Sequence, residues 1–190
     1  MTDVIRAFIA FELPNIVLAA IGKVQARFQP YRFNVRWVKT GNIHLTLKFL
    51  GNIKSDDIDK IHRAMAVAAK NCGPISLAAG GVGVFPGTKK PRVIWVGISD
   101  EKHQLTGLQK SIDDHLVEIG FARENRPFKG HLTLGRVKGR IDSRRLATAV
   151  EESGSFEPIA FTVDRIILYR SELKPAGPIY TRLKSVEMLL

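Results

Sequence analysis

One tetrapeptide that occurs twice holds the residues with the clearest chemical potential. The sequence His-Leu-Thr-Leu begins at His44 and again at His131, each time within a stretch of β-forming residues that predicts a strand. Side chains two positions apart in a strand point to the same face. Each copy therefore places a histidine beside a threonine, with two leucines on the opposite face. Because both copies are identical and occupy equivalent places, they favour a site built from two matched halves.

The residues of this repeat are suited to acid–base chemistry on a phosphate ester. Imidazole titrates near neutrality, so one histidine can take a proton from a nucleophile while the other gives a proton to a leaving group. The hydroxyls of Thr46 and Thr133 can donate hydrogen bonds to phosphoryl oxygens, and Arg136 adds a permanent positive charge. We therefore predict that His44 and His131 are catalytic and that Thr46, Thr133 and Arg136 bind the substrate's phosphate.

The sequence gives little support for other kinds of functional site. The sequence has no phosphate-binding loop of the Gly-x-x-x-x-Gly-Lys-Ser/Thr type, no Gly-x-Ser-x-Gly and no His-x-x-x-His. The remaining histidines, His62, His103 and His115, lie in predicted helices beside apolar stripes. We expect neither a bound metal nor a cofactor.

The elements that must position these residues alternate between strands and helices. Strands are predicted over residues 4–13, 33–38, 43–53, 75–85, 92–98, 130–137, 156–169 and 179–186. Helices are predicted over residues 16–28, 105–119 and 142–153, and from Ser55 to the stop at residues 71–74.

The two halves of the chain follow the same plan. Arg6 precedes His44 by almost the same number of residues as Arg92 precedes His131, and a helix start follows each histidine at equal spacing. We predict one domain over residues 1–190, with pseudo-repeats of roughly 1–88 and 89–190. Hairpin-length connections favour antiparallel sheets, so the expected fold is α+β and bilobal: two pseudo-symmetric lobes, each a sheet with flanking helices, around a central cleft.

Composition and charge indicate which classes of partner the protein can bind. Lysine and arginine outnumber acidic residues by 29 to 18, and such a basic surface attracts polyanions, RNA first among them. No apolar run is long enough to span a membrane, and the single cysteine, Cys72, allows no internal disulfide. We therefore expect a cytoplasmic monomer, with no membrane partner, that binds RNA or another polyanion. A non-catalytic module that binds RNA or nucleotides remains an alternative.

Longer stretches around the repeat carry a resemblance that covers nearly the whole chain. The sequence resembles the two-histidine phosphoesterase superfamily, and within it the RNA 2′,3′-cyclic phosphodiesterases, historically called 2′-5′ RNA ligases. Gly130 departs from the family pattern, which usually has proline directly before the second histidine. The stretches that carry the resemblance are Arg6-Ala-Phe-Ile-Ala, His44-Leu-Thr-Leu-Lys-Phe-Leu-Gly, Gly83-Val-Phe-Pro, Pro91-Arg-Val-Ile-Trp-Val-Gly and Arg126-Pro-Phe-Lys-Gly-His-Leu-Thr-Leu-Gly-Arg-Val, with Tyr180 near the end.

The resemblance implies that RNA ends or cyclic nucleotides are the substrates. It implies hydrolysis of RNA-terminal 2′,3′-cyclic phosphates to 2′-phosphates without a metal or a nucleotide cofactor. It implies that His44 is the proton donor and His131 the proton acceptor. It also implies that Phe49 stacks near the terminal base, whereas strand alternation places Phe49 on the buried leucine face unless a bulge intervenes. Some members join or cleave 2′-5′ linkages, so ligase activity remains an alternative.

Overall fold

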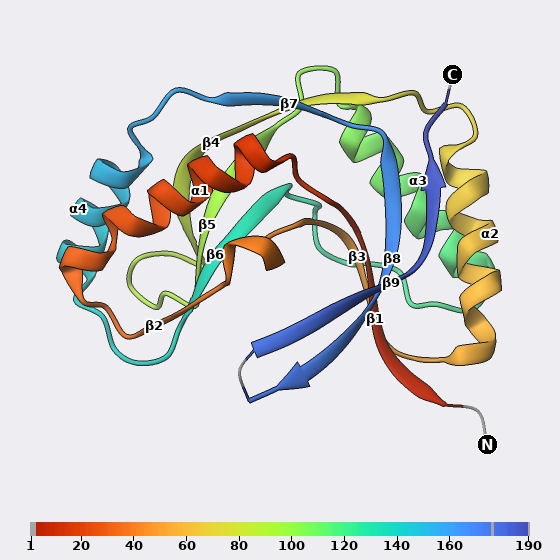
Figure 1. Ribbon diagram of the computed structural model, residues 1–190, viewed down its shortest axis with the longest axis horizontal. Helices are drawn as coiled ribbons and strands as arrows, with labels where there is room; N and C mark the ends of the chain where they lie inside the picture. The colour runs from red at the N-terminus through yellow and green to blue at the C-terminus, as the bar shows by residue number, and fades with distance from the viewer. Residues whose placement is uncertain (1–2, 176, 190) are drawn as a thin grey trace.

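The computed structural model describes residues 3–175 and 177–189 of the chain, which form one curved sheet covered by helices (Figure 1). The strands are β1 (Val4–Phe11), β2 (Val35–Trp37), β3 (Leu45–Lys54), β4 (Ile75–Phe85), β5 (Val93–Ser99), β6 (His131–Val137), β7 (Ile159–Val163), β8 (Arg165–Lys174) and β9 (Gly177–Glu187). The α-helices are α1 (Asn15–Arg27), α2 (Ile58–Ala69), α3 (Gln104–Glu118) and α4 (Ser143–Gly154). Short 3-10 helices cover Gln29–Tyr31, Thr40–Asn42 and Ser55–Asp57.

The strands pair in the order β7-β4-β5-β6-β3-β1-β8-β9, with β2 also paired to β6, and every pairing between described residues is antiparallel. Strands β3 and β6 are bridged through Leu45 and Leu132, the single such pair in the described part of the chain. This narrow junction divides the sheet into a first lobe (β3, β1, β8, β9) and a second lobe (β2, β6, β5, β4, β7).

Helices cover the convex side of each lobe and bury the main core. In the first lobe α2 packs on α3 and β9, and in the second α4 packs on β4 and α1 (Figure 1). The helix α1 is fixed to the second lobe because the Gln25 side chain donates hydrogen bonds to the carbonyls of Val38 and Leu134. The buried side chains under these helices form one continuous apolar cluster that spans both lobes.

The lobes are interleaved along the chain. Strand β4, from the first half of the sequence, pairs with β5 in the second lobe, whereas β8 and β9 from the second half pair in the first lobe. Only Asp164 separates β7 from β8, so one nearly continuous extended segment runs along the top of Figure 1 from one lobe to the other. Neither lobe is therefore made from one half of the chain alone.

The predicted α+β class with antiparallel pairing around two lobes is confirmed. Two local expectations need correction. The single strand predicted over residues 156–169 is instead all of β7 and the first part of β8, which belong to different lobes and are separated by Asp164 alone. At Ser55 a short 3-10 helix precedes α2, and no described side chain caps that helix, whereas Asp142 caps α4 by accepting hydrogen bonds from the amides of Arg144 and Arg145.

No helix among the described residues is both long and apolar enough to cross a membrane.

Candidate active site

The two repeated histidines are held by the same backbone device. The Nδ1 of His44 lies 2.8 Å from the carbonyl oxygen of Asn42, and the Nδ1 of His131 lies 2.8 Å from the carbonyl oxygen of Lys129. A carbonyl oxygen can only accept, so Nδ1 carries the hydrogen in both rings. Each Nε2 is thereby left as the atom that can take a proton when the ring is neutral and give one when it is charged.

The junction between the lobes brings the two copies together. Leu45 and Leu132 pair at the junction and are fully buried, so the flanking residues lie on the opposite face of the sheet. In this antiparallel register Thr46 comes next to His131, and His44 next to Thr133. The two copies of the repeated tetrapeptide are therefore antiparallel neighbours that meet at the Leu45–Leu132 pair.

A cavity of about 530 Å³ opens between the lobes on this face. Of the predicted site residues, five line it: His44, Thr46, Phe49, Thr133 and Arg136. His131 is not among the lining residues and stands beside the cavity, next to Thr46 across the junction. The structure thus gathers the predicted phosphate-binding groups around one space, with one histidine in its wall and the other at its edge.

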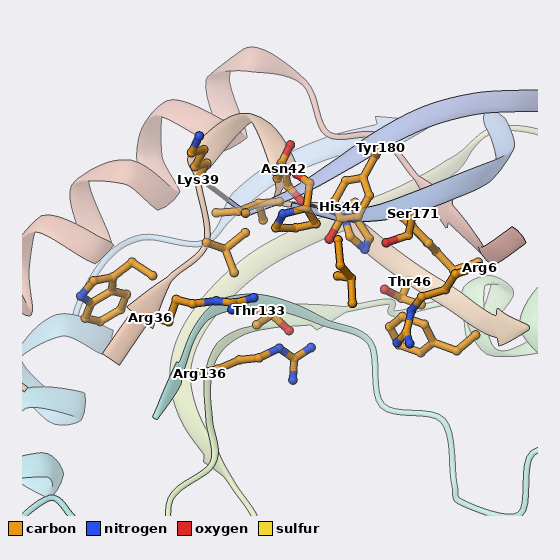
Figure 2. Close-up of a pocket in the computed structure, with 18 of the residues that line it drawn as sticks. Arg6, Arg36, Lys39, Asn42, His44, Thr46, Thr133, Arg136, Ser171 and Tyr180 are labelled. Carbon is orange, nitrogen blue, oxygen red and sulfur yellow. Dashed lines mark hydrogen bonds between the residues drawn. The ribbon is translucent and has the colours of Figure 1, made fainter. Parts of the chain in front are cut away.

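The cavity is strongly basic. Arg6, Arg36 and Lys39 line it in addition to Arg136, and no acidic side chain is among the described residues in its wall. Figure 2 shows Arg36 and Arg136 on the side of Thr133 and Arg6 on the side of Thr46. Such a lining is suited to an anionic ligand that spans the space between the lobes.

Arg36 and Arg136 face each other directly across the β2–β6 pairing. Like charges in opposed positions of a sheet destabilise it, and within the described part of the chain neither arginine has a carboxylate partner. An anion bound between them would relieve this repulsion.

The surroundings of His44 disfavour its charged form. Its ring stacks on Phe8 with centroids 4.6 Å apart and meets the edge of Tyr180 at 5.2 Å. Burial lowers the pKa of His44 below its usual value, and the nearby charges of Arg136 and His131 lower it further, against the raising effect of the Asn42 carbonyl. A bound phosphate would offset the charge of Arg136 and so favour protonation of His44.

Phe49 corrects the expectation drawn from strand alternation. Ile9 pairs with Lys48 and Ala10 with Thr46, so Leu47 is an extra residue in β3 and forms a bulge. Beyond the bulge Lys48 turns into the core, and Phe49 is 58% exposed in the cavity wall. The prediction that Phe49 is buried was wrong for this reason.

Sequence reasoning did not single out Arg36, Lys39 or Asn42. Residues 33–38 were predicted as a strand, which gave no indication of which strand Arg36 would face. Asn42 acts through its backbone, which accepts from His44, while its side chain donates to the Pro178 carbonyl in the β8–β9 hairpin. Backbone roles of this kind leave no signal in residue type.

Comparison with known proteins gives a consistent picture. A family model described as the 2′-5′ RNA ligase superfamily matches residues 18–175. A protein of Methanothermobacter thermautotrophicus named RNA 2′,3′-cyclic phosphodiesterase is 34% identical over 177 residues, which are 93% of this chain and 95% of that protein. A protein of Aquifex aeolicus with the same name is 31% identical over 180 residues, covering 94% of each chain.

Solved structures share the fold. The crystal structure of TT0787 of Thermus thermophilus superposes with a TM-score of 0.80 at 27% identity and covers 96% of this chain and 97% of that one. The apo form of E. coli LigT gives a TM-score of 0.78 at 23% identity, with both chains fully covered. At that identity the likeness to LigT concerns the fold.

Proposed function

Because the chain belongs to the 2′-5′ RNA ligase superfamily and is a phosphoesterase, we propose that it hydrolyses RNA-terminal 2′,3′-cyclic phosphates to 2′-phosphates, by acid–base catalysis that needs no metal. Its relatives named RNA 2′,3′-cyclic phosphodiesterase support the substrate. The observation that carries the mechanism is the matched anchoring of His44 and His131, each with Nδ1–H bound to a backbone carbonyl and Nε2 free.

In the proposed reaction the phosphorus lies between the two histidines. His131 takes a proton through Nε2 from the attacking water, and His44 gives a proton through Nε2 to the departing 3′ oxygen. The bond from phosphorus to the 3′ oxygen breaks as the bond to the water oxygen forms, which leaves a 2′-phosphate and a 3′-hydroxyl. The two rings end with exchanged protonation states and are reset by solvent.

The remaining groups hold the substrate. Thr46 and Thr133 donate hydrogen bonds to the non-bridging oxygens, and Arg136 neutralises the charge that develops on them. We add Arg36, which stands directly across the sheet from Arg136. Phe49, exposed in the cavity wall, stacks on the terminal base.

The test is hydrolysis of a 2′,3′-cyclic nucleotide and of an RNA that ends in a cyclic phosphate, in EDTA, followed by phosphorus NMR. We expect a 2′-phosphate as product, and a loss of at least about a hundredfold in kcat for His44→Ala and for His131→Ala. His62→Ala, on α2, is the matched control and should keep wild-type activity.

Two outcomes would contradict the proposal. Wild-type rates in both histidine variants would remove the acid–base roles, and full dependence on an added metal would remove metal independence. Tight, salt-sensitive RNA binding without any turnover would favour the alternative of a non-catalytic binding module.

A further inference from the structure

A small apolar cluster beside His44 is separate from the main core. Its buried members are Phe8, Ala10, Ile167 and Tyr169, and Tyr180 packs against them. The alternate residues of the same strands, such as Ile9 on β1 and Leu168 on β8, belong to the main core. Because side chains alternate along a strand, the two clusters lie on opposite faces of the sheet, and the small one lies on the face that carries the site.

Three rings on this face form one stack that ends at His44. The Phe8 ring stacks on His44, with centroids 4.6 Å and planes 28° apart, and also on Tyr169, with centroids 5.2 Å and planes 19° apart. The strand order sets this arrangement, since β1 lies between β3 and β8 and Phe8 pairs directly with Tyr169. The plane of the His44 ring therefore depends on Phe8, and that of Phe8 on Tyr169.

A polar anchor holds the far end of the stack. Tyr169 is 7% exposed, and its hydroxyl donates to the Glu12 carboxylate at 2.5 Å. Arg182, which pairs with Tyr169 across β8 and β9, donates to both oxygens of the same carboxylate. Burial and the Glu12 carboxylate raise the pKa of Tyr169, so its hydroxyl keeps its proton and remains a donor. The anchor thus fixes the Tyr169 ring in the sheet.

His44 needs such a restraint because it stands between two spaces. Besides the substrate cavity, a second hollow of about 320 Å³ is lined by His44, Tyr180 and the three anchor residues. Close packing holds a side chain in one rotamer, and a ring with space on two sides has less of it. The stack on Phe8 supplies the missing restraint, in addition to the bond from Nδ1 to the Asn42 carbonyl.

The anchor residues lie outside the substrate cavity. Phe8 lines that cavity, but Glu12, Tyr169 and Arg182 do not. They can therefore act on the reaction only through the orientation of His44. A general acid must point its proton at the leaving oxygen, and a small misplacement of a reacting group lowers the rate strongly.

We propose that Tyr169, held by Glu12 and Arg182, is a positioning residue that orients the His44 ring through Phe8. This inference rests on the proposed function, in which Nε2 of His44 gives a proton to the 3′ oxygen. The restraint acts on proton transfer, whereas the residues of the cavity bind the substrate. Its loss should consequently lower kcat and leave KM nearly unchanged.

The first test is the hydrolysis of a 2′,3′-cyclic mononucleotide by variants of Tyr169. Tyr169→Leu removes the ring, and we expect kcat to fall about tenfold with KM within about twofold of the wild type. Tyr169→Phe keeps the ring and loses only the anchor, so kcat should fall less, by about threefold. Tyr31→Phe is the matched control, because the Tyr31 hydroxyl also donates to a glutamate, Glu152, but in the other lobe; it should keep wild-type kcat.

The second test asks whether the hydroxyl acts through Glu12. Glu12→Leu removes the acceptor and should lower kcat about as much as Tyr169→Phe does. The double variant should be no slower than the slower single variant, because both changes break the same bond. Effects on kcat that multiply in the double variant would contradict the proposed anchor.

A spectroscopic readout makes the test independent of turnover. The stacked Phe8 ring shifts the NMR signals of the carbon-bound protons of His44, so Tyr169→Leu should move these signals. A looser stack also admits water, which should raise the pKa of His44 toward its usual value. Arg136, His131 and the Asn42 carbonyl, which also act on this pKa, are unchanged in the variant. Tyr31→Phe should alter neither property.

Wild-type kcat in Tyr169→Leu, a rise in KM alone, or unmoved His44 signals would overturn the positioning role. If Tyr169→Leu does not fold, Tyr169→Phe and its coupling to Glu12→Leu decide the matter, since both rings of the stack remain. Failure of the wild type to hydrolyse the cyclic mononucleotide would instead count against the proposed function, and the NMR signals would still decide whether Tyr169 orients His44.

Discussion

At the scale of single residues, the two histidines have equal anchors and unequal surroundings. Both rings donate Nδ1–H to a carbonyl two positions earlier in the chain. His44, however, is desolvated between Phe8 and Tyr180, and its pKa is lowered. The lowered pKa of His44 can be used to assign its role.

We predict that the imidazole of His44 titrates below pH 6.5 in the free enzyme, because burial and the charge of Arg136 both oppose its protonation. Arg136→Gln removes one of these causes and should raise the pKa of His44. The measurement is an NMR titration of histidine ring signals, assigned with His44→Ala. A titration above pH 6.5 in the wild type would contradict the prediction.

The same variant indicates which role His44 has. A general acid must hold its proton, so activity that depends on it is lost as pH rises through its pKa. If His44 is the acid, raising its pKa in Arg136→Gln moves the alkaline limb of the kcat/KM profile to higher pH. A shift of the acidic limb instead would make His44 the base.

Arg36 is expected to increase the affinity for substrate and to lower the stability of the fold. Arg36→Ala removes a proposed phosphate contact, so we predict an increase in KM of about tenfold or more, in line with about 1.5–3 kcal/mol for a hydrogen bond to a charged group. It also removes the repulsion with Arg136, and the free energy of unfolding should rise by a few tenths of a kcal/mol. Steady-state kinetics and urea denaturation measure the two effects. Arg63→Ala, on α2, is the control and should change neither; a KM unchanged in Arg36→Ala would remove its role.

At the scale of elements, regular patterns were predictable and irregular ones were not. Periodic apolar residues placed the α-helices of the described part of the chain, and residue type predicted the helix start at Asp142. The bulge at Leu47 was not predictable from sequence. One extra residue in a strand reverses the face to which the following side chains point, but it does not change the composition of the segment. The position of Phe49 in the site depends on that bulge.

The pairing partners of the strands also could not be predicted from the local sequence. Nothing in residues 33–38 indicates that β2 joins the second lobe and sets Arg36 opposite Arg136. Gly135 permits this approach, since a Cβ there would come within 2.5 Å of Val35 and 2.9 Å of Trp37. The residue types of the site could therefore be predicted, but its second arginine required the fold.

A buried ion pair connects the elements that carry the two histidines. The Lys48 ammonium on β3 contacts the Asp113 carboxylate on α3, both side chains are 6% exposed, and Lys48 also donates to the carbonyl of Ala122. Asp113 in turn accepts from the amide of Glu124, in the segment that leads to β6. The bulged strand is thus held to the loop before His131.

Removing one member of this pair should be costly. We predict that Asp113→Leu alone lowers the free energy of unfolding by about 3–5 kcal/mol, because it leaves the buried Lys48 ammonium without its carboxylate. Lys48→Met should cost less, because the Arg123 guanidinium lies 3.7 Å from the Asp113 carboxylate and remains as a partner. The double variant should recover most of the loss, since it leaves no buried charge. Urea denaturation of all four proteins gives the coupling. Additive losses in the double variant would show that the pair does not act as a unit.

At the scale of the whole molecule, the two lobes carry equivalent site residues but are not built independently of each other. His44 and His131 are placed on either side of the Leu45–Leu132 pair, yet each lobe takes strands from both halves of the sequence. The apolar core is continuous beneath them. The cavity between the lobes is consequently enclosed by elements from the beginning, the middle and the end of the chain.

Because the strand order is interleaved, we expect that two fragments of the chain could complement each other and reassemble into the folded protein. A cut in the loop between β4 and β5 would leave His44 on one piece and His131 on the other, and each piece would hold strands of both lobes without their neighbours. Neither fragment should fold or turn over substrate alone, whereas mixing them should restore both circular dichroism and hydrolysis. A fragment that folded by itself would contradict this expectation. The proposed catalytic pair, His44 and His131, would then exist only in the reassembled molecule, so activity would report directly on association.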